Sequence, residues 1–268
     1  EPDSFEVILE PENTANWRGP QIGRGLIAVA RRLEENGFTP EIIAPSNTSM
    51  KNAISYFDEM IEVEGVEDYL DVFGYHRYGR QTRELVEDIR ERADAHNLKT
   101  AMLEKVGAGI DTLLEDLTVG RVSSWQQWAA AGKLVDGDER GGFYVLVNTS
   151  EAELPRVHLS KLSYPLSQVF LFVRRGAIRI DARSDNPDKT SVAFINRDGG
   201  RVVVIRAKKA GAPVTVNGLP AGQYGVRFVD DRQNIEQLAP VTVSGEGALQ
   251  FDMPRSGVAT VYSMEPVS

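Results

Sequence analysis

The sequence predicts an α/β protein that consists of strands 4 to 8 of a (β/α)8 TIM barrel followed by an antiparallel β-sandwich. Short apolar runs alternate with helical segments up to about residue 130, which is typical of parallel strands joined by helical crossovers. Polar side chains follow the predicted strands, as they do at the carboxyl end of a barrel. From about residue 176, alternating segments are separated by glycine-containing turns, which favours antiparallel hairpins.

The first two strand–helix units are predicted from residues 5 to 61. Phe5–Leu9 is a short run rich in β-forming residues, and proline, asparagine and glycine follow it. Apolar residues then recur on one helical face over residues 22–33, until an Asn-Gly pair ends the pattern. The same order repeats, with a strand at residues 41–44 and an amphipathic helix at residues 50–61.

The alternation continues for two further units and a last strand. Residues 69–75 are predicted to be a strand, and residues 85–93 carry the next amphipathic helix. A strand follows at residues 99–103, then a weaker helix at residues 111–117 and a final strand at residues 122–128. These elements fit either a doubly wound sheet or a barrel.

The loops distinguish these two folds. The loop after the first strand, PENTANWRGPQIG, is long and lacks the G-x-G-x-x-G turn of a nucleotide-binding sheet. In a barrel, by contrast, functional side chains follow the strands. The residues at the predicted strand ends are Glu10, Ser46, His76, Tyr78, Glu104 and Trp125. The barrel is therefore favoured.

The spacing of two glutamates places the strands within the barrel. Glu10 and Glu104 are separated by three strand–helix units of about 31 residues each. If residues 122–128 form strand 8, Glu104 ends strand 7 and Glu10 ends strand 4. Strands 1 to 3 are then expected to be missing from this chain, which would leave unpaired sheet edges and exposed apolar surface.

The second half of the chain predicts a separate all-β domain. A helical pattern at residues 162–173 leads into a strand that ends at Ile180, and seven alternating segments follow. These segments read SVAFIN, RVVVIRA, PVTVNG, YGVRFVD, PVTVS, ALQFDM and VATVYSM. We therefore predict a barrel domain at residues 1–175 and a β-sandwich at residues 176–268.

Several of these segments resemble a known group of enzymes. Leu9-Glu10-Pro11 and Met102-Leu103-Glu104 resemble the clan A retaining glycoside hydrolases, in which an acid/base Glu ends strand 4 and a nucleophile Glu ends strand 7. The junction SQVFLFVRRGAIRI and the following SVAFINRDGGRVVVI are similar to glycoside hydrolase family 30. The resemblance implies that Glu10 is the acid/base and Glu104 the nucleophile. It departs from the family pattern at Leu9, where an Asn is usual.

Two carboxylates at one barrel mouth suit this chemistry, because one protonates the departing oxygen while the other attacks the anomeric carbon. Glu12 is the alternative acid/base, although the Glu-Pro order favours Glu10. Other side chains at or near the predicted strand ends are assigned to substrate binding on position and on their ability to stack or hydrogen-bond. These residues are Trp17, Ser46, His76, Tyr78 and Trp125.

Composition limits the possible partners. The net charge of -9 lacks the basic surface that nucleic acid or an anionic membrane requires. There are no cysteines, the three histidines lack metal-ligand spacing, and the charged run Asp136–Glu139 departs from calcium-loop spacing. We therefore predict no metal and no cofactor, and a carbohydrate as the binding partner. Secretion or a periplasmic location is implied by the family resemblance only, and the oligomeric state is left open.

These observations predict a retaining β-glycosidase that hydrolyses O-glycosidic bonds by double displacement. The alternative is a non-catalytic carbohydrate-binding or pseudoenzyme fragment, suggested by Leu9 and by the strands expected to be missing. A doubly wound binding module joined to a sandwich is a third interpretation.

Overall fold

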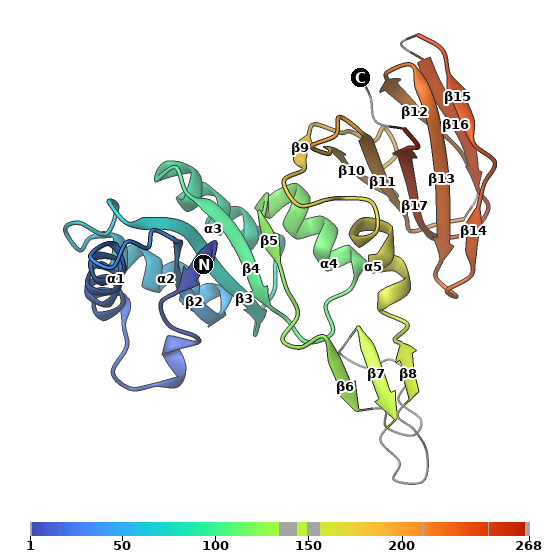
Figure 1. Cartoon of the computed structure of the whole chain (residues 1–268). Helices are drawn as coiled ribbons and strands as arrows, with labels where there is room; N and C mark the ends of the chain where they lie inside the picture. The colour runs from blue at the N-terminus through green and yellow to red at the C-terminus, as the bar shows by residue number, and fades with distance from the viewer. Residues whose placement is uncertain (1, 134–143, 149–155, 211, 246, 266–268) are drawn as a thin grey trace. The chain divides into compact units, whose positions relative to one another are not determined.

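The computed structural model describes residues 2–133, 144–148, 156–210, 212–245 and 247–265 (Figure 1). The chain folds into two compact units. The first contains residues 1–106 and 115–129, and the second contains residues 107–114 and 130–268. The domain boundary predicted at residue 175 stays a prediction, and the charged run Asp136–Glu139 lies outside the described residues.

The first unit is built on a curled sheet of five parallel strands whose spatial order is their order in the chain. The strands are β1 (Ser4–Glu6), β2 (Glu41–Ser49), β3 (Leu70–Tyr78), β4 (Lys99–Glu104) and β5 (Ser124–Trp125). Within the described residues, β1 and β5 form the two edges of this sheet. The predicted mixed α/β fold with parallel strands is thus confirmed.

Helices connect these strands. They are a 3-10 turn η1 (Pro11–Asn13), α1 (Gly19–Glu34), α2 (Met50–Ile61), α3 (Arg83–Ala95) and α4 (Ile110–Glu115), which continues into a π-helical turn η2 (Asp116–Gly120). Side chains cap two of them, because Ser49 accepts a hydrogen bond from the Asn52 N–H and Thr82 accepts one from the Leu85 N–H. Alternating helices and strands are visible in Figure 1.

A large apolar core lies between α1, α2 and α3 and one face of the sheet. Phe57 of α2 stacks on Phe73 of β3 with ring centroids 4.4 Å apart. Helices α1 and α2 approach closely at Gly19, where an added Cβ would lie 2.5 Å from the Tyr56 carbonyl oxygen. The opposite face carries a smaller apolar cluster of Ile43, Val72, Ala101 and Leu103.

The strand lengths differ from the predictions in ways that affect the functional side chains. Strands β2 and β3 continue beyond the predicted ends, so Ser46, His76 and Tyr78 lie within strands rather than in the loops after them. Strand β1 ends at Glu6, before the predicted end at Leu9, and the backbone of Glu10 adopts a left-handed conformation before Pro11. Strand β5 has two residues instead of the predicted run at 122–128.

The second unit contains a three-stranded sheet that sequence analysis did not predict. It consists of β6 (Ala131–Lys133), β7 (Val145–Asn148) and β8 (Arg156–Leu159). Helix α5 (Ser163–Phe170) follows, and the Thr260 hydroxyl donates to the Gln168 carbonyl at 2.7 Å. The three strands are short and only partly apolar, which explains why their pattern is weak.

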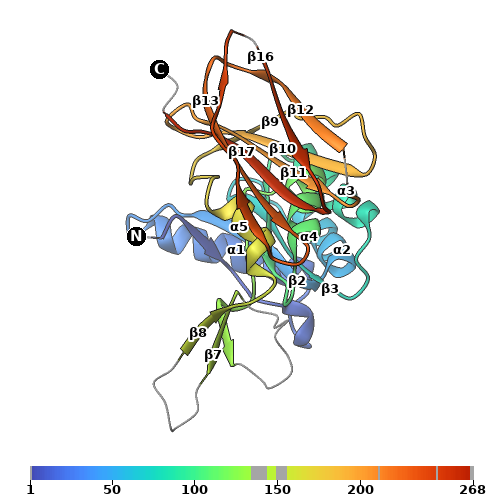
Figure 2. The same ribbon diagram turned by 90° about the vertical axis from the view of Figure 1, so that its right-hand side faces the viewer.

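The rest of the second unit consists of antiparallel strands in two facing layers (Figure 2). One layer has the order β14-β13-β17-β11-β10-β9, with β15 beside β13, and the other is the pair β12-β16. Apolar residues from both layers form one core. The strands are β9 (Ile178–Ile180), β10 (Lys189–Ile195), β11 (Arg201–Ala207), β12 (Ala212–Leu219), β13 (Gly222–Asp230), β14 (Ile235–Gln237), β15 (Val241–Val243), β16 (Gly247–Met253) and β17 (Gly257–Ser263).

Tyr144, in the second unit, makes stability depend on pH above neutrality. Its ring packs edge-on against Phe170, and burial raises its pKa to about 12 from an ordinary value near 10. Between about pH 10 and 12 the unfolded chain therefore ionises this phenol while the folded chain does not. We expect the free energy of unfolding to fall by up to about 1.4 kcal/mol per pH unit in this interval.

The measurement is urea unfolding at pH 9, 10, 11 and 12, comparing the unmodified protein with Tyr144→Phe. The unmodified protein should lose stability relative to Tyr144→Phe as the pH rises across the interval, since phenylalanine does not titrate. A difference that stays constant from pH 9 to 12 would contradict the assignment.

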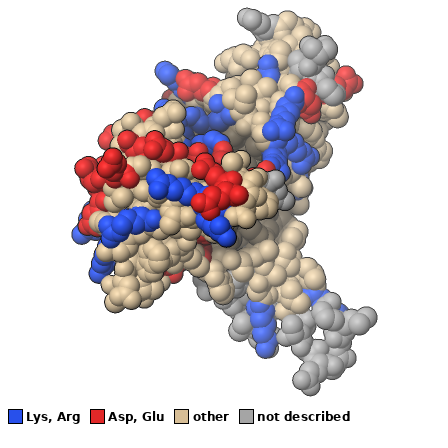
Figure 3. Space-filling view, turned by 60° about the vertical axis from the view of Figure 1, so that its left-hand side comes forward, with Lys and Arg blue, Asp and Glu red and all other residues tan. Residues whose placement is uncertain are grey.

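Charges of both signs are interspersed on the face shown in Figure 3. On α3, Arg83 and Glu87 form an ion pair at 2.8 Å across one helical turn. Among the described residues, no helix has the length and apolar character needed to span a membrane.

Candidate active site

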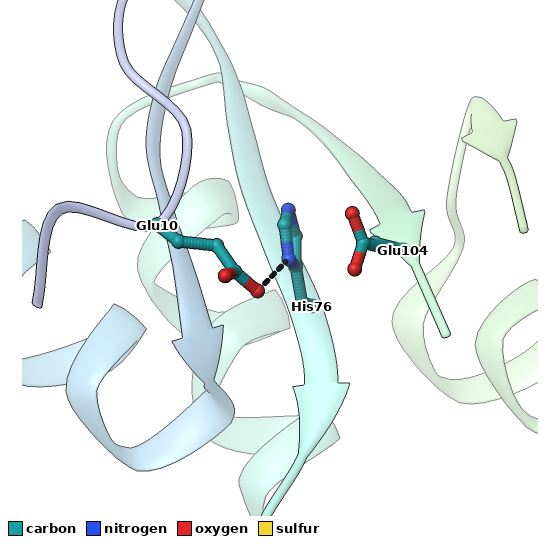
Figure 4. Close-up of side chains that lie close together, drawn as sticks. All are labelled: Glu10, His76 and Glu104. Carbon is teal, nitrogen blue, oxygen red and sulfur yellow. Dashed lines mark hydrogen bonds and ion pairs between the residues drawn. The ribbon is translucent and has the colours of Figure 1, made fainter. Parts of the chain in front are cut away.

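Glu10, His76 and Glu104 come together on the first unit, although they belong to three different parts of the chain. One carboxylate oxygen of Glu10, one of Glu104 and one ring nitrogen of His76 all lie within 4.8 Å of one another. Figure 4 shows the three side chains turned toward one another, with Glu10 approaching from the segment after β1 and Glu104 from the end of β4. The two predicted catalytic residues, Glu10 and Glu104, are therefore brought close together.

Backbone geometry aims the Glu10 side chain. Its φ of 48° and ψ of 58° are left-handed, a conformation that is uncommon outside glycine. Two backbone bonds support it, because the Glu10 N–H donates to the Ser46 carbonyl at 3.0 Å and the Asn13 N–H donates to the Glu10 carbonyl at 3.0 Å. The preceding Leu9 side chain is 58% exposed.

Both carboxylate oxygens of Glu10 have partners. The Asn13 side-chain amide donates to Oε2 at 2.7 Å. Nδ1 of the fully buried His76 lies 3.1 Å from Oε1. The carboxylate itself is partly exposed, with 21% of the side-chain surface accessible. It is therefore held by the buried His76 through Oε1 and by the exposed Asn13 through Oε2.

Glu104 is aimed by an irregularity in the sheet. Tyr75 pairs with Met102 and the next residue, His76, pairs with Glu104, so β4 contains one extra residue at this point. Tyr75 and Met102 face the helices, and strict alternation would have turned Glu104 to that side as well. The bulge instead places Glu104 on the same face as His76, as bulges beside active sites often do.

Tyr78 is the hydrogen-bond partner of Glu104. Its hydroxyl donates to Oε1 of Glu104 at 3.0 Å and accepts a bond from the Val106 N–H at 3.1 Å. Burial, together with the bond to Glu104, raises the pKa of Tyr78, so the phenol stays a proton donor at neutral pH. Lys105 Nζ lies 4.9 Å from the centre of the Tyr78 ring.

Ser46 is placed behind His76 rather than on the surface. It is fully buried, with a φ of 56°, and its hydroxyl oxygen lies 3.1 Å from Nε2 of His76. The same hydroxyl donates to Oε1 of Glu6. Ser46 and His76 therefore contact the candidate acid/base from within the protein, and their predicted roles in substrate binding stay predictions.

Glu12, the alternative acid/base, has a different environment. Its carboxylate accepts bonds from the Asn47 side chain at 2.7 Å and from the Ser49 N–H at 3.0 Å. It therefore binds at the start of α2, where a negative charge is favourable. This arrangement favours Glu10 as the residue available for chemistry.

The two tryptophans make other contacts. Trp17 packs against the helix–sheet core and lies over Gly25 of α1. Trp125 packs against the same core, and its indole N–H donates to Asp116 at 2.9 Å. Their predicted stacking on sugar stays a prediction.

Asp116 organises a buried polar cluster that sequence analysis missed. This fully buried carboxylate accepts bonds from Tyr75 at 2.7 Å, Arg77 at 2.8 Å and Trp125 at 2.9 Å. Arg77 also donates to Glu115 at 2.6 Å. A buried Asp or Arg is rare, and this rarity is the signal that could have identified the cluster. The sequence did not show that Asp116 is buried, because the apolar pattern around it is weak.

Glu10, His76 and Glu104 are also residue types that bind divalent metal ions. Both ring nitrogens of His76, however, already lie within hydrogen-bond distance of Ser46 and Glu10. We therefore assign no metal to this site. What remains is a pair of facing carboxylates supported by a buried histidine and a tyrosine, which suits acid–base and nucleophilic chemistry.

Several solved structures that share the fold of this chain are described as glycoside hydrolases. The catalytic domain of GH30 xylanase C from Talaromyces cellulolyticus superimposes with a TM-score of 0.74 and 17% identity, covering 98% of this chain and 62% of the xylanase. A GH30 endoxylanase from Clostridium papyrosolvens C71 gives a TM-score of 0.70 and 18% identity, covering 97% of this chain and 65% of the endoxylanase.

A conserved exported protein from Bacteroides fragilis gives a TM-score of 0.74 and 15% identity, covering 97% of this chain and 65% of that protein. No protein-family model and no curated protein matches the sequence. The chain spans less than two thirds of the length of these three solved structures. Its fold is similar to part of these GH30 structures, and the predicted resemblance is confirmed at this level.

Proposed function

We propose that the protein is a retaining β-glycosidase in which Glu10 is the acid/base and Glu104 is the nucleophile. The observation that carries the proposal is the pair of facing carboxylates, with oxygens within 4.8 Å of each other. Retaining enzymes have carboxyl groups about 5 to 5.5 Å apart, whereas inverting enzymes need about 6.5 to 9.5 Å to admit a water molecule.

In the first step, Glu104 attacks the anomeric carbon while Glu10 gives a proton to the departing oxygen, forming a glycosyl–enzyme ester and releasing an alcohol. In the second step, Glu10 takes a proton from water, which displaces Glu104 and restores both carboxyl groups. The Tyr78 hydroxyl, 3.0 Å from Glu104, orients the nucleophile. The Asn13 amide orients Glu10.

The similar folds support the strand assignment. In this proposal β1 to β5 correspond to strands 4 to 8 of a (β/α)8 barrel, so that Glu10 and Glu104 follow strands 4 and 7. The partner is a carbohydrate. Secretion or a periplasmic location is proposed because a similar structure is that of an exported protein.

A non-catalytic carbohydrate-binding protein is the second candidate. The exposed apolar Leu9 occupies the position where the family pattern has an Asn that contacts the sugar. Such a protein would bind a glycan without hydrolysing it, so turnover of an aryl β-glycoside distinguishes the two functions.

The role of Glu10 is tested by replacing it with glutamine in the full protein. Loss of the general acid should lower kcat/KM for xylan or glucan fragments by about 10²- to 10⁴-fold. For dinitrophenyl β-xyloside and β-glucoside, the rate of the first step should fall much less, because their leaving groups need no proton. Glu12→Gln is the matched control and should retain activity, since Glu12 binds the start of α2.

The product first formed by the unmodified protein, followed by NMR, should be the β-anomer. A large loss in Glu12→Gln with none in Glu10→Gln would reverse the assignment. An α-anomer as first product would exclude the double displacement.

A further inference from the structure

A buried chain of hydrogen bonds connects Glu6 of β1 to Glu10. The Ser46 hydroxyl donates to Oε1 of Glu6, and its oxygen lies 3.1 Å from Nε2 of His76. The other ring nitrogen, Nδ1, lies 3.1 Å from Oε1 of Glu10. Ser46 and His76 are both fully buried, so solvent does not compete for the bond between them.

The direction of each bond follows from the protons available. An ionised carboxylate only accepts hydrogen bonds, and a serine hydroxyl has one proton to donate. Because Ser46 gives that proton to Glu6, its oxygen accepts from His76, which requires a proton on Nε2. In the neutral ring, Nδ1 then carries a lone pair that faces Glu10.

We infer that Glu6 and Ser46 are positioning residues that keep His76 protonated on Nε2. As a result, the contact between Nδ1 of His76 and the Glu10 carboxyl group needs a proton between the two atoms. The inference rests on the proposed function, in which Glu10 is the acid/base. Two lone pairs 3.1 Å apart repel, so the contact between Nδ1 and Oε1 is favourable only when a proton lies between them. Glu10 is thus supplied with the proton that it gives to the departing oxygen.

The same arrangement assists the second step. After Glu10 has released its proton, the Nδ1 lone pair again faces the carboxylate at 3.1 Å. This contact favours recapture of a proton by Glu10, and the attacking water supplies it. The proton released to the alcohol in the first step is thereby replaced in the second, without a change at Glu6 or Ser46.

Other charged or titratable groups around His76 come from β3 and β4. A carboxylate oxygen of Glu104 lies within 4.8 Å of a His76 ring nitrogen. The Tyr78 ring lies 6.4 Å from the imidazole, centroid to centroid, and Lys105 lies over its ring. These groups are unchanged in Glu6 and Ser46 variants. A difference in His76 protonation between those variants and the unmodified protein is therefore due to the hydrogen bonds of Glu6 and Ser46.

The protonation of His76 is measured directly by ¹⁵N NMR of ring-labelled protein. The chain has three histidines, and His96 and His158 serve as internal references. In the unmodified protein, Nε2 of His76 should carry a proton throughout pH 5 to 9. A ring protonated on Nδ1 alone would overturn the inference at once.

Two variants test the cause. In Ser46→Ala the Nε2 proton loses its acceptor, and in Glu6→Ala the Ser46 hydroxyl is free to donate to Nε2 instead. Both should shift His76 from the Nε2–H form to a mixture or to the Nδ1–H form. Ser55→Ala on the exposed face of α2 is the matched serine control and should leave His76 unchanged.

Activity supplies the second measurement. In both variants the loss of kcat/KM should be larger at alkaline than at acid pH, because the Nδ1 contact that favours a proton on Glu10 is lost. A purely structural role would lower activity equally at every pH. Unchanged His76 protonation in both variants would overturn the inference, whether or not the protein is active.

The Nε2–H form without hydrolysis would instead exclude the proposed function and support the hydrogen-bond assignment. If Ser46→Ala does not fold, the unmodified protein and Glu6→Ala, at a partly exposed position, still decide the result.

Discussion

Replacing Glu104 by glycine in the full protein is expected to lower the hydrolysis of an aryl β-glycoside by roughly 10⁴- to 10⁶-fold, because no covalent intermediate can form. Added azide should restore turnover, since a small anion fits the space left by the side chain. A single displacement inverts the anomeric centre, so the rescued product should be the α-glycosyl azide. Product NMR with and without azide provides the measurement.

Glu104→Gln serves as the control, because the glutamine side chain fills the space and should prevent rescue by azide. Retained hydrolysis in Glu104→Gly without azide, or a β-glycosyl azide, would count against Glu104 as the nucleophile. Rescue in the glycine variant alone would support the proposed double displacement.

Replacing Asp116 by alanine is expected to destabilise the first unit by about 3 to 5 kcal/mol, because it leaves the buried Arg77 without its main partner. Tyr75 and Trp125 would lose their acceptor as well. Burial raises the pKa of the Asp116 carboxyl, and the charge of Arg77 with the bonds from Tyr75 and Trp125 opposes this rise only in part. The cluster thus depends on all four side chains being present.

Tryptophan fluorescence during urea unfolding measures this change, because the three tryptophans all lie in the first unit. Glu115→Gln is the matched control and should cost only about 1 kcal/mol, since Glu115 is partly exposed and leaves Arg77 bound to Asp116. A loss below about 1 kcal/mol in Asp116→Ala would show that Arg77 finds another partner or water.

Much of the first unit could be predicted because local periodicity carries the signal. The helix predicted at residues 50–61 coincides with α2, and the strand predicted at residues 99–103 is contained in β4. Apolar residues recurring every three to four positions, or in short runs, indicate which face or segment is buried without knowledge of its partner. The β6–β8 sheet lacked such a signal and was missed.

The candidate carboxylates were also visible in the sequence, since both follow predicted strands and carboxyl ends of parallel strands share one edge of a sheet. Their supporting groups were only partly visible. His76 and Tyr78 were predicted as substrate-binding residues, which stays a prediction, and the structure shows that they also pair with Glu10 and Glu104. Glu6 and Asp116 were not singled out, because a side chain's burial depends on segments that are distant in the chain.

Composition, strand–helix alternation and the positions of Glu10 and Glu104 therefore follow from the sequence alone, since each depends on neighbouring residues. The tertiary structure decided the directions of the side chains. The extra residue in β4 turns Glu104 toward His76, and the left-handed backbone at Glu10 and Ser46 brings their side chains to the same imidazole. Register and backbone reversal arise from pairing between distant strands, which local periodicity does not encode.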